Sequence, residues 1–260
     1  MLMTTLLLFA LAGLAAGFLA GLLGIGGGLI VVPLLYFHFN ADPATAPNAM
    51  HLALGSSLAF IVFNSGFASW MHMRLDGVRW QEVRRLAPGL AIGSLAGAAV
   101  ADWLPTEMLA RFFGVFLLAM AVLMVAGRAG EVRQPPQWVS MIIGAPIGML
   151  AALAGVGGGV MVVPWMLARG HRAAHAVATS SVCTVLVAAL GTVGYVLFAD
   201  PVPLRGATGY IYWPAVIGIG VTALLTARFG ARLAHRVDQK LLRKGFALLL
   251  VIVGLRLLLA

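Results

Sequence analysis

The chain has 260 residues, of which 62% are hydrophobic and only 10% are charged. Soluble domains carry about 25% charged residues, so this composition excludes a water-soluble globular protein. The net charge of +9 would suit a nucleic-acid-binding protein, but the basic residues fall between apolar runs and form no basic-aromatic stretch. Several of these runs exceed the roughly 20 residues with which a helix crosses a bilayer. We therefore expect a polytopic protein in a lipid bilayer, with no nucleic acid as partner.

The apolar run at residues 1–24 lacks the basic beginning of a secretory signal, so we expect it to be mature structure. The single cysteine, Cys183, excludes an internal disulfide and leaves no thiol pair for metal or redox chemistry. We expect neither a metal nor a cofactor.

Three ordered matches indicate an internal repeat. The matched segments, each followed by the offset in residue number, are 21–33 with 152–164 (131), 51–57 with 175–181 (124), and 97–98 with 230–231 (133). The first pair reads GLLGIGGGLIVVP and ALAGVGGGVMVVP, and the second reads HLALGSS and HAVATSS. Three matches in the same order make chance similarity a poor explanation.

The repeat divides the chain into a first half at residues 1–127, a polar linker at 128–137 and a second half at 138–260. Each half begins with an apolar segment that a glycine cluster interrupts, and three helices follow. We expect these helices to end near residues 73, 103 and 126 in the first half, and near 198, 235 and 259 in the second.

The glycine clusters predict helix breaks. They comprise Gly26, Gly27 and Gly28 in the first half, and Gly157, Gly158 and Gly159 in the second. Each glycine costs a helix about 1 kcal/mol relative to alanine. In hydrocarbon a broken helix is tolerated only against protein or a water-filled cavity. Both breaks are therefore expected to line an interior site, although close helix packing would also favour glycine.

Residues 4–38 would measure about 52 Å as one helix, which is too long for a single crossing. A kinked crossing would make the two halves parallel, whereas a re-entrant hairpin gives three further crossings per half and inverts the second half. The hairpin leaves only Arg111, Arg205 and Arg256 outside, with 14 basic residues inside, whereas the kinked crossing gives 8 inside and 9 outside. The positive-inside rule favours the hairpin, with both termini outside. The second arm is about half a crossing, so the depth of the hairpin stays open.

The fold class expected is thus an all-α membrane protein with two inverted repeats, each a glycine-broken hairpin plus three transmembrane helices. Inverted repeats with broken helices are typical of secondary transporters, which bind substrate near the midplane. Helices that begin after Gly28 and Gly159 would present free amides and a positive dipole end, and two of them would suit an anion.

Hydroxyl-rich segments follow each glycine cluster and could donate hydrogen bonds to anion oxygens. They contain Ser56 and Ser57 in the first half, and Thr179, Ser180 and Ser181 in the second. These hydroxyls could equally bond to carbonyls of their own or neighbouring helices. The matched His51 and His175 could carry a coupled proton. All eight carboxylates fall in predicted loops or at helix ends, which disfavours a cation pump.

The two motifs GLLGIGGGLIVVP and ALAGVGGGVMVVP, each followed by a hydroxyl-rich helix, resemble the sulfite exporter TauE/SafE family of membrane permeases. The resemblance covers both halves. It implies an anion permease of the bacterial inner membrane that moves sulfite, thiosulfate, sulfoacetate or related small anions. Carried over by position, the glycine turns of the family fall on residues 24–28 and 155–159. The Gly-Thr-Ser pattern of the family appears altered, as Gly55-Ser56-Ser57 and Ala178-Thr179-Ser180.

Two alternatives remain at this point. The same backbone amides could line an anion channel. An intramembrane serine hydrolase would need a serine and a base within hydrogen-bond reach, but the sequence has no G-x-S-x-G elbow, so no enzyme is expected. The transported anion, the direction, the coupling ion and the oligomeric state stay open.

Overall fold

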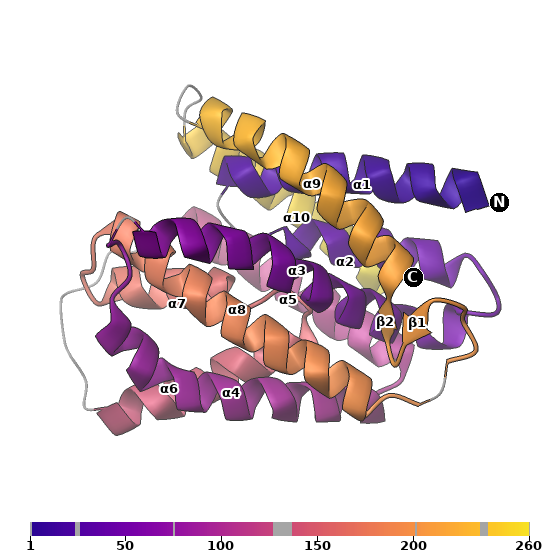
Figure 1. The fold of residues 1–260 in the computed structure, drawn as a ribbon, viewed down its shortest axis with the longest axis horizontal. Helices are drawn as coiled ribbons and strands as arrows, with labels where there is room; N and C mark the ends of the chain where they lie inside the picture. The colour runs from indigo at the N-terminus through magenta and orange to yellow at the C-terminus, as the bar shows by residue number, and fades with distance from the viewer. Residues whose placement is uncertain are drawn as a thin grey trace.

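The computed structural model describes residues 2–23, 27–74, 76–126, 137–200, 202–234 and 239–259, and the fold is almost entirely helical (Figure 1). The first half contains α1 (Leu2–Leu23), α2 (Gly28–Asn40), the short 3-10 helix η1 (Ala46–Asn48), α3 (Ala49–Arg74), α4 (Trp80–Trp103) and α5 (Thr106–Ala126). The second half contains α6 (Gln137–Leu153), α7 (Gly159–Ala168), α8 (Ala173–Leu197), the strands β1 (Ala207–Thr208) and β2 (Ile211–Tyr212), α9 (Trp213–Ala234) and α10 (Gln239–Leu259).

The helix ends lie within one residue of those predicted from the sequence. α3, α4 and α5 end at residues 74, 103 and 126, and α8, α9 and α10 end at residues 197, 234 and 259. α1 ends at residue 23 and α2 begins at residue 28, while α6 ends at residue 153 and α7 begins at residue 159. Both glycine clusters therefore interrupt a helix, as predicted.

Each half begins with a helical hairpin. The ring of Phe9, near the start of α1, lies 5.0 Å from the ring of His38, near the end of α2, so these two arms run antiparallel. In the second half, Met141 near the start of α6 lies against Gly89 in the third turn of α4, and Arg169 just after α7 binds Glu82 in the first turn of α4. These contacts are those expected of a hairpin.

The two hairpins open toward opposite ends of the molecule. Phe9 and Phe39 of the first hairpin both contact the ring of Tyr212 in β2. We call this end, made of residues 38–51, 101–106 and 202–213, the strand end. The second hairpin opens toward the other end, made of residues 74, 76–85 and 169–175, which we call the arginine-rich end. α1 begins and α10 ends on the side of the strand end (Figure 1).

The helices of the two halves pack against one another in matched pairs. α1 packs on α9 and α6 packs on α4, while α3 lies against α8 and α5 against α10. α3 and α8 are thus central, and α3 is buried continuously from Ala49 to Ile61. A helix that is apolar on all sides and buried is expected in the interior of a membrane bundle.

Glycines at repeat-equivalent positions make these pairings close. A Cβ on Gly13 of α1 would lie 2.5 Å from the Ile219 carbonyl oxygen of α9. A Cβ on Gly144 of α6 would lie 2.7 Å from the Leu86 carbonyl oxygen of α4. Gly144 follows Gly13 by 131 positions and Ile219 follows Leu86 by 133, the offsets of the repeat. The same contact is therefore made twice with the roles of the halves exchanged, and small residues permit it as they do in other membrane bundles.

The outer surface suits a bilayer. Four helical segments are long and apolar enough to cross a membrane, at residues 46–74, 80–103, 106–123 and 173–197, within the part of the chain that the structure describes. Exposed tryptophans lie at helix ends, at Trp70, Trp80, Trp103, Trp138 and Trp213. Tryptophan is enriched at both membrane interfaces, so these residues mark the boundaries of the apolar surface.

Candidate transport site

The two glycine breaks meet at the centre of the molecule. A Cβ on Gly28 would lie 2.9 Å from the carbonyl oxygen of Gly155 and 2.8 Å from the side chain of Ile61 on α3. On the other side of the contact, a Cβ on Gly157 would lie 2.7 Å from the side chain of Thr184 on α8. Both α3 and α8 are met near their midpoints, so the contact lies at half the height of the bundle. Gly26, which belongs to the predicted site, lies outside the described residues.

Local backbone geometry explains the second break. Gly155 has φ +61°, and the amide of Val156 donates to the carbonyl of Ala151 while the amide of Gly155 donates to that of Ala152, both at 3.1 Å. This pair of bonds is a Schellman motif, which ends a helix with a left-handed residue. Gly157 follows with φ +52°, so the chain turns twice before α7 begins.

The first break also contains a glycine in the left-handed conformation. Gly27 has φ +79° and precedes α2, and its carbonyl accepts hydrogen bonds from the amides of Ile30 and Val31. A residue with a side chain rarely adopts this backbone angle. Gly158, in contrast, has φ −64°, so space and not backbone angle favours glycine there.

α2 and α7 begin at this central contact and run to opposite ends. α2 reaches the strand end, where the hydroxyl of Thr45 donates to the Phe39 carbonyl, and α7 reaches the arginine-rich end at Arg169. The first-turn amides of both short helices are therefore directed toward the middle of the molecule. Each helix N-terminus carries the equivalent of about half a positive charge.

Three hydroxyls lie at the central contact. Ser57 of α3 donates a hydrogen bond of 2.8 Å to the Gly155 carbonyl. A Cβ on Gly159 would lie 2.7 Å from the hydroxyl of Thr184 and 4.0 Å from that of Ser180, so both hydroxyls face the start of α7. Thr184 was not predicted from the sequence. Its position four residues after Ser180 on one helix face was the signal available.

Ser56 and Thr179 instead join the halves to one another. Ser56 accepts a hydrogen bond of 2.9 Å from the amide of Tyr212, and Thr179 accepts one of 3.0 Å from the amide of Arg79. Tyr212 follows Arg79 by 133 positions, so the two amide donors are repeat equivalents, whereas Thr179 stands one residue before the position equivalent to Ser56. Ser180 and Ser181 donate to the carbonyls three residues earlier in their own helix, at Val177 and Ala178.

His51 and His175 lie at opposite ends of the molecule, and the structure does not bring them together. The His51 Nε2 donates to the Ala101 carbonyl at 3.0 Å, and its ring lies 4.8 Å from that of Tyr210. Burial raises the pKa of Tyr210 to about 12, and its neutral hydroxyl donates to Asp102.

His175 makes equivalent contacts at the arginine-rich end. Its Nδ1 donates to the Gly77 carbonyl at 2.9 Å, and its Nε2 accepts from the Arg79 guanidinium at 3.0 Å. His51 thus binds the last turn of α4 and His175 binds the segment just before α4, both away from the central contact.

A buried ion pair at the arginine-rich end was missed by the sequence analysis. The Glu82 carboxylate is 2.8 Å from Arg169 and 3.1 Å from Arg85, and its residue is 3% exposed. His171 is 3.9 Å away, and burial lowers the pKa of its imidazole. Glu82 does lie in the first turn of a helix, as predicted, but position in sequence did not indicate burial.

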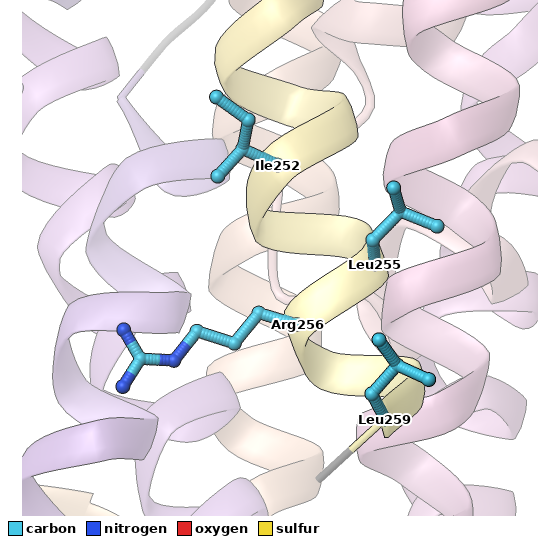
Figure 2. Close-up of a pocket in the computed structure, with 4 residues that line it drawn as sticks. All are labelled: Ile252, Leu255, Arg256 and Leu259. Atoms are coloured by element: carbon cyan, nitrogen blue, oxygen red, sulfur yellow. The ribbon is translucent and has the colours of Figure 1, made fainter.

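Two pockets accompany these features. One, of about 510 Å³, is lined by Ile252, Leu255, Arg256 and Leu259 on the outer face of α10. Figure 2 shows Arg256 directed away from the two leucines, and its guanidinium lies 4.7 Å from the ring centre of Phe37. This groove is lined mostly by apolar side chains and offers little to a polar substrate. The other, of about 470 Å³, adjoins Glu82.

Within the described ranges, no three side chains of His, Cys, Asp or Glu gather as metal ligands. Cys183 is buried in α8. The polar groups at the centre are backbone amides, carbonyls and hydroxyls.

Comparisons with known proteins find relatives that match nearly the whole chain. The chain is 35% identical to a probable membrane transporter protein of Haemophilus influenzae over 97% of both chains. It is 26% identical to one of Methanocaldococcus jannaschii, covering 97% of this chain and 95% of the relative. It is 23% identical to the probable membrane transporter protein YunE of Bacillus subtilis over 94% of both. No solved structure is detectably similar.

These relatives are named as membrane transporters and not as enzymes, in agreement with the expectation from the sequence. The family described as "Sulfite exporter TauE/SafE" matches residues 9–257, which is nearly the whole chain. The chain is therefore a membrane transporter that belongs to the TauE/SafE family.

Proposed function

We propose that this transporter carries small anions, and that sulfur oxyanions or organosulfonates such as sulfite, thiosulfate and sulfoacetate are its substrates. The observation that supports the proposal most is the central meeting of two short helices at their N-terminal ends. Backbone amides and a positive dipole end attract anions. The family description supports the sulfur-anion class.

The substrate-binding groups proposed are the amides of the glycine turns and the hydroxyls that face them. They comprise the amides of Gly26, Gly27, Gly28, Gly157, Gly158 and Gly159 and the hydroxyls of Ser57, Ser180 and Thr184. Ser57 and Ser180 would bind the anion by exchanging the hydrogen bonds that they donate to Gly155 and Val177. Ser56, Thr179 and Ser181 were predicted for the same role. Their hydrogen bonds to Tyr212, Arg79 and Ala178 favour a structural role instead, in which they hold α3 and α8 around the site.

Transport would proceed by alternating access, with one half rocking against the other around the fixed site. The repeat-equivalent contacts of Gly13 with Ile219 and of Gly144 with Leu86 support two related halves in inverted orientation. Two such halves can exchange inward-open and outward-open states at similar free energy, because each state reproduces the contacts of the other with the halves interchanged.

Proton coupling through His51 and His175 belongs to the proposal as well. Each imidazole connects a central helix to one end of α4. His51 does so from α3 through Ala101, and His175 does so from α8 through Gly77. Protonation would place a charge at the contact between moving parts, which is how histidine acts in other pH-dependent switches.

We assign the protein to the bacterial inner membrane with both termini outside. Support comes from the arginines of the arginine-rich end, which the positive-inside rule orients toward the cytoplasm. Those with described side chains are Arg74, Arg79, Arg84, Arg85, Arg169 and Arg172.

The proposal is tested by flux of radiolabelled sulfite and thiosulfate into and out of vesicles that contain the purified protein. Saturable flux that unlabelled anion accelerates from the opposite side is expected for a carrier. Single-channel currents would indicate the anion channel instead. Absence of flux for sulfite, thiosulfate and sulfoacetate from either side, in vesicles whose protein is folded, would refute the proposal.

A further inference from the structure

At the arginine-rich end, one buried carboxylate lies among several cationic side chains. Glu82 bonds to Arg169 and Arg85, and Arg79 lines the adjoining pocket. Three guanidinium groups thus stand near one carboxylate. Arginine is the side chain best suited to bind carboxylates and oxyanions through paired hydrogen bonds.

The ion pair is buried and links the two halves. Glu82 lies in the first turn of α4, and Arg169 follows α7 directly. Both residues are about 5% exposed or less. A buried guanidinium requires a negative partner, because an uncompensated buried charge costs several kcal/mol. Whatever occupies the carboxylate position must therefore be an anion.

A pocket of about 470 Å³ opens beside this ion pair. It is lined by Val78, Arg79, Trp80, Gln81, Glu82 and His171. The exposed Arg79 and the amide of Gln81 supply hydrogen-bond donors on its wall, and the only acid in the lining is Glu82, whose charge Arg169 and Arg85 already balance. The pocket is large enough for a small oxyanion with its water.

We propose that this pocket is a second anion-binding site, an access vestibule in which the carboxylate of Glu82 acts as a tethered competitor of the transported anion for Arg169 and Arg85. The proposal rests on the proposed function for the identity of the anion. α7 connects the vestibule to the central contact, since Gly159 begins this helix and Arg169 follows it. The ten residues of α7 span about 15 Å, so an anion that displaces Glu82 lies one short helix away from the central site.

Competition predicts an unusual effect of Glu82→Gln. The substitution removes the tethered charge but keeps the side-chain shape, so that an anion approaching Arg169 and Arg85 no longer competes with the Glu82 carboxylate. The sulfate concentration that gives half-maximal thermal stabilisation of the purified protein should be about tenfold lower for Glu82→Gln than for wild type, a coupling of ordinary size. Chloride at matched ionic strength serves as the reference. A merely structural Glu82 would lower the melting temperature without changing the sulfate dependence, and that result would overturn the proposal.

Cysteine protection gives a second measurement that does not depend on the stability of Glu82→Gln. The native Cys183 is buried, so Gln81→Cys introduces one accessible thiol into the vestibule. Sulfate and sulfoacetate should slow its reaction with an anionic methanethiosulfonate reagent at least fivefold, and Arg79→Gln should abolish this protection. Thr208→Cys at the strand end is the matched control and should show no protection. Equal protection at both positions, or none at residue 81, would overturn the proposal.

The outcomes separate this site from the central one. Protection at residue 81 without any anion flux supports the vestibule and counts against the proposed function. Flux without protection at residue 81 overturns the vestibule and leaves the proposed function standing.

Discussion

The hydroxyl of Ser57 on α3 donates a 2.8 Å hydrogen bond to the carbonyl of Gly155 in the second glycine turn. The bond crosses from one half of the chain to the other at the level where both helices are interrupted. An irregular turn inside a bilayer leaves carbonyls that no helix satisfies, and Ser57 satisfies one of them. The packing of the two breaks thus depends on a hydroxyl contributed by the opposite half.

Ser57→Ala should lower stability because the buried Gly155 carbonyl loses its partner. We expect a loss of about 1–3 kcal/mol, measured as thermal unfolding of the detergent-solubilised protein. Ser181→Ala is the matched control, since Ser181 donates only to Ala178 in its own helix, and it should change stability little. Equal losses in the two variants would contradict this role of Ser57.

Gly93→Leu should separate α4 from α6. A Cβ on Gly93 would overlap the carbonyl oxygen of Ala145, whereas a Cβ on Gly66 of α3 would meet no atom within 4 Å. Overpacking typically costs about 1–3 kcal/mol, and yield of folded protein on gel filtration reports it. Gly66→Ala should behave as wild type. Normal folding of Gly93→Leu would show that the close α4–α6 contact is not required.

Thr184→Val tests the hydroxyl that faces the start of α7. Valine keeps the shape of threonine, so the fold should persist while one donor to the anion is lost. A neutral hydrogen bond contributes about 0.5–1.5 kcal/mol, so we expect thiosulfate affinity to fall roughly 2- to 12-fold, measured by equilibrium binding. Thr192→Val makes the same change farther along α8 and should leave affinity unaltered. A loss in both variants would place the effect in helix packing instead.

Cysteine labelling can determine on which side of the membrane the strand end and the arginine-rich end lie. Thr208→Cys at the strand end should react with an impermeant maleimide in intact cells, and Arg172→Cys at the arginine-rich end should react only after permeabilisation. The buried Cys183 gives a low background. Labelling of both positions from the same side would contradict the inverted arrangement, and labelling with the sides exchanged would place the termini in the cytoplasm.

Much of the fold follows from the sequence because glycine and proline interrupt long apolar runs. The breaks at the two glycine clusters and the ends of α3, α4 and α5 are examples. The exchanged pairing of α1 with α9 and of α6 with α4 was not predictable in the same way. In lipid the hydrophobic pattern of a helix does not identify its partner, since lipid and protein neighbours are both apolar.

The candidate site was predicted only in part. The repeat located the glycine turns, but it could not distinguish Ser57, which bonds to the turn, from Ser56, which accepts from Tyr212. Neighbouring residues on a helix point in directions about 100° apart, and which one faces the site depends on how the helices pack. Glu82 was missed because its partner Arg169 lies 87 residues away.

The central claim is that an anion binds where the glycine turns meet, and equilibrium binding of radiolabelled thiosulfate to purified protein tests it most directly. Gly27→Leu forces a side chain onto a residue with φ +79°, and Gly158→Leu fills the space beside Val187. Both variants should lose saturable binding while Gly66→Ala retains it. Wild-type affinity in folded Gly27→Leu and Gly158→Leu proteins would contradict the account.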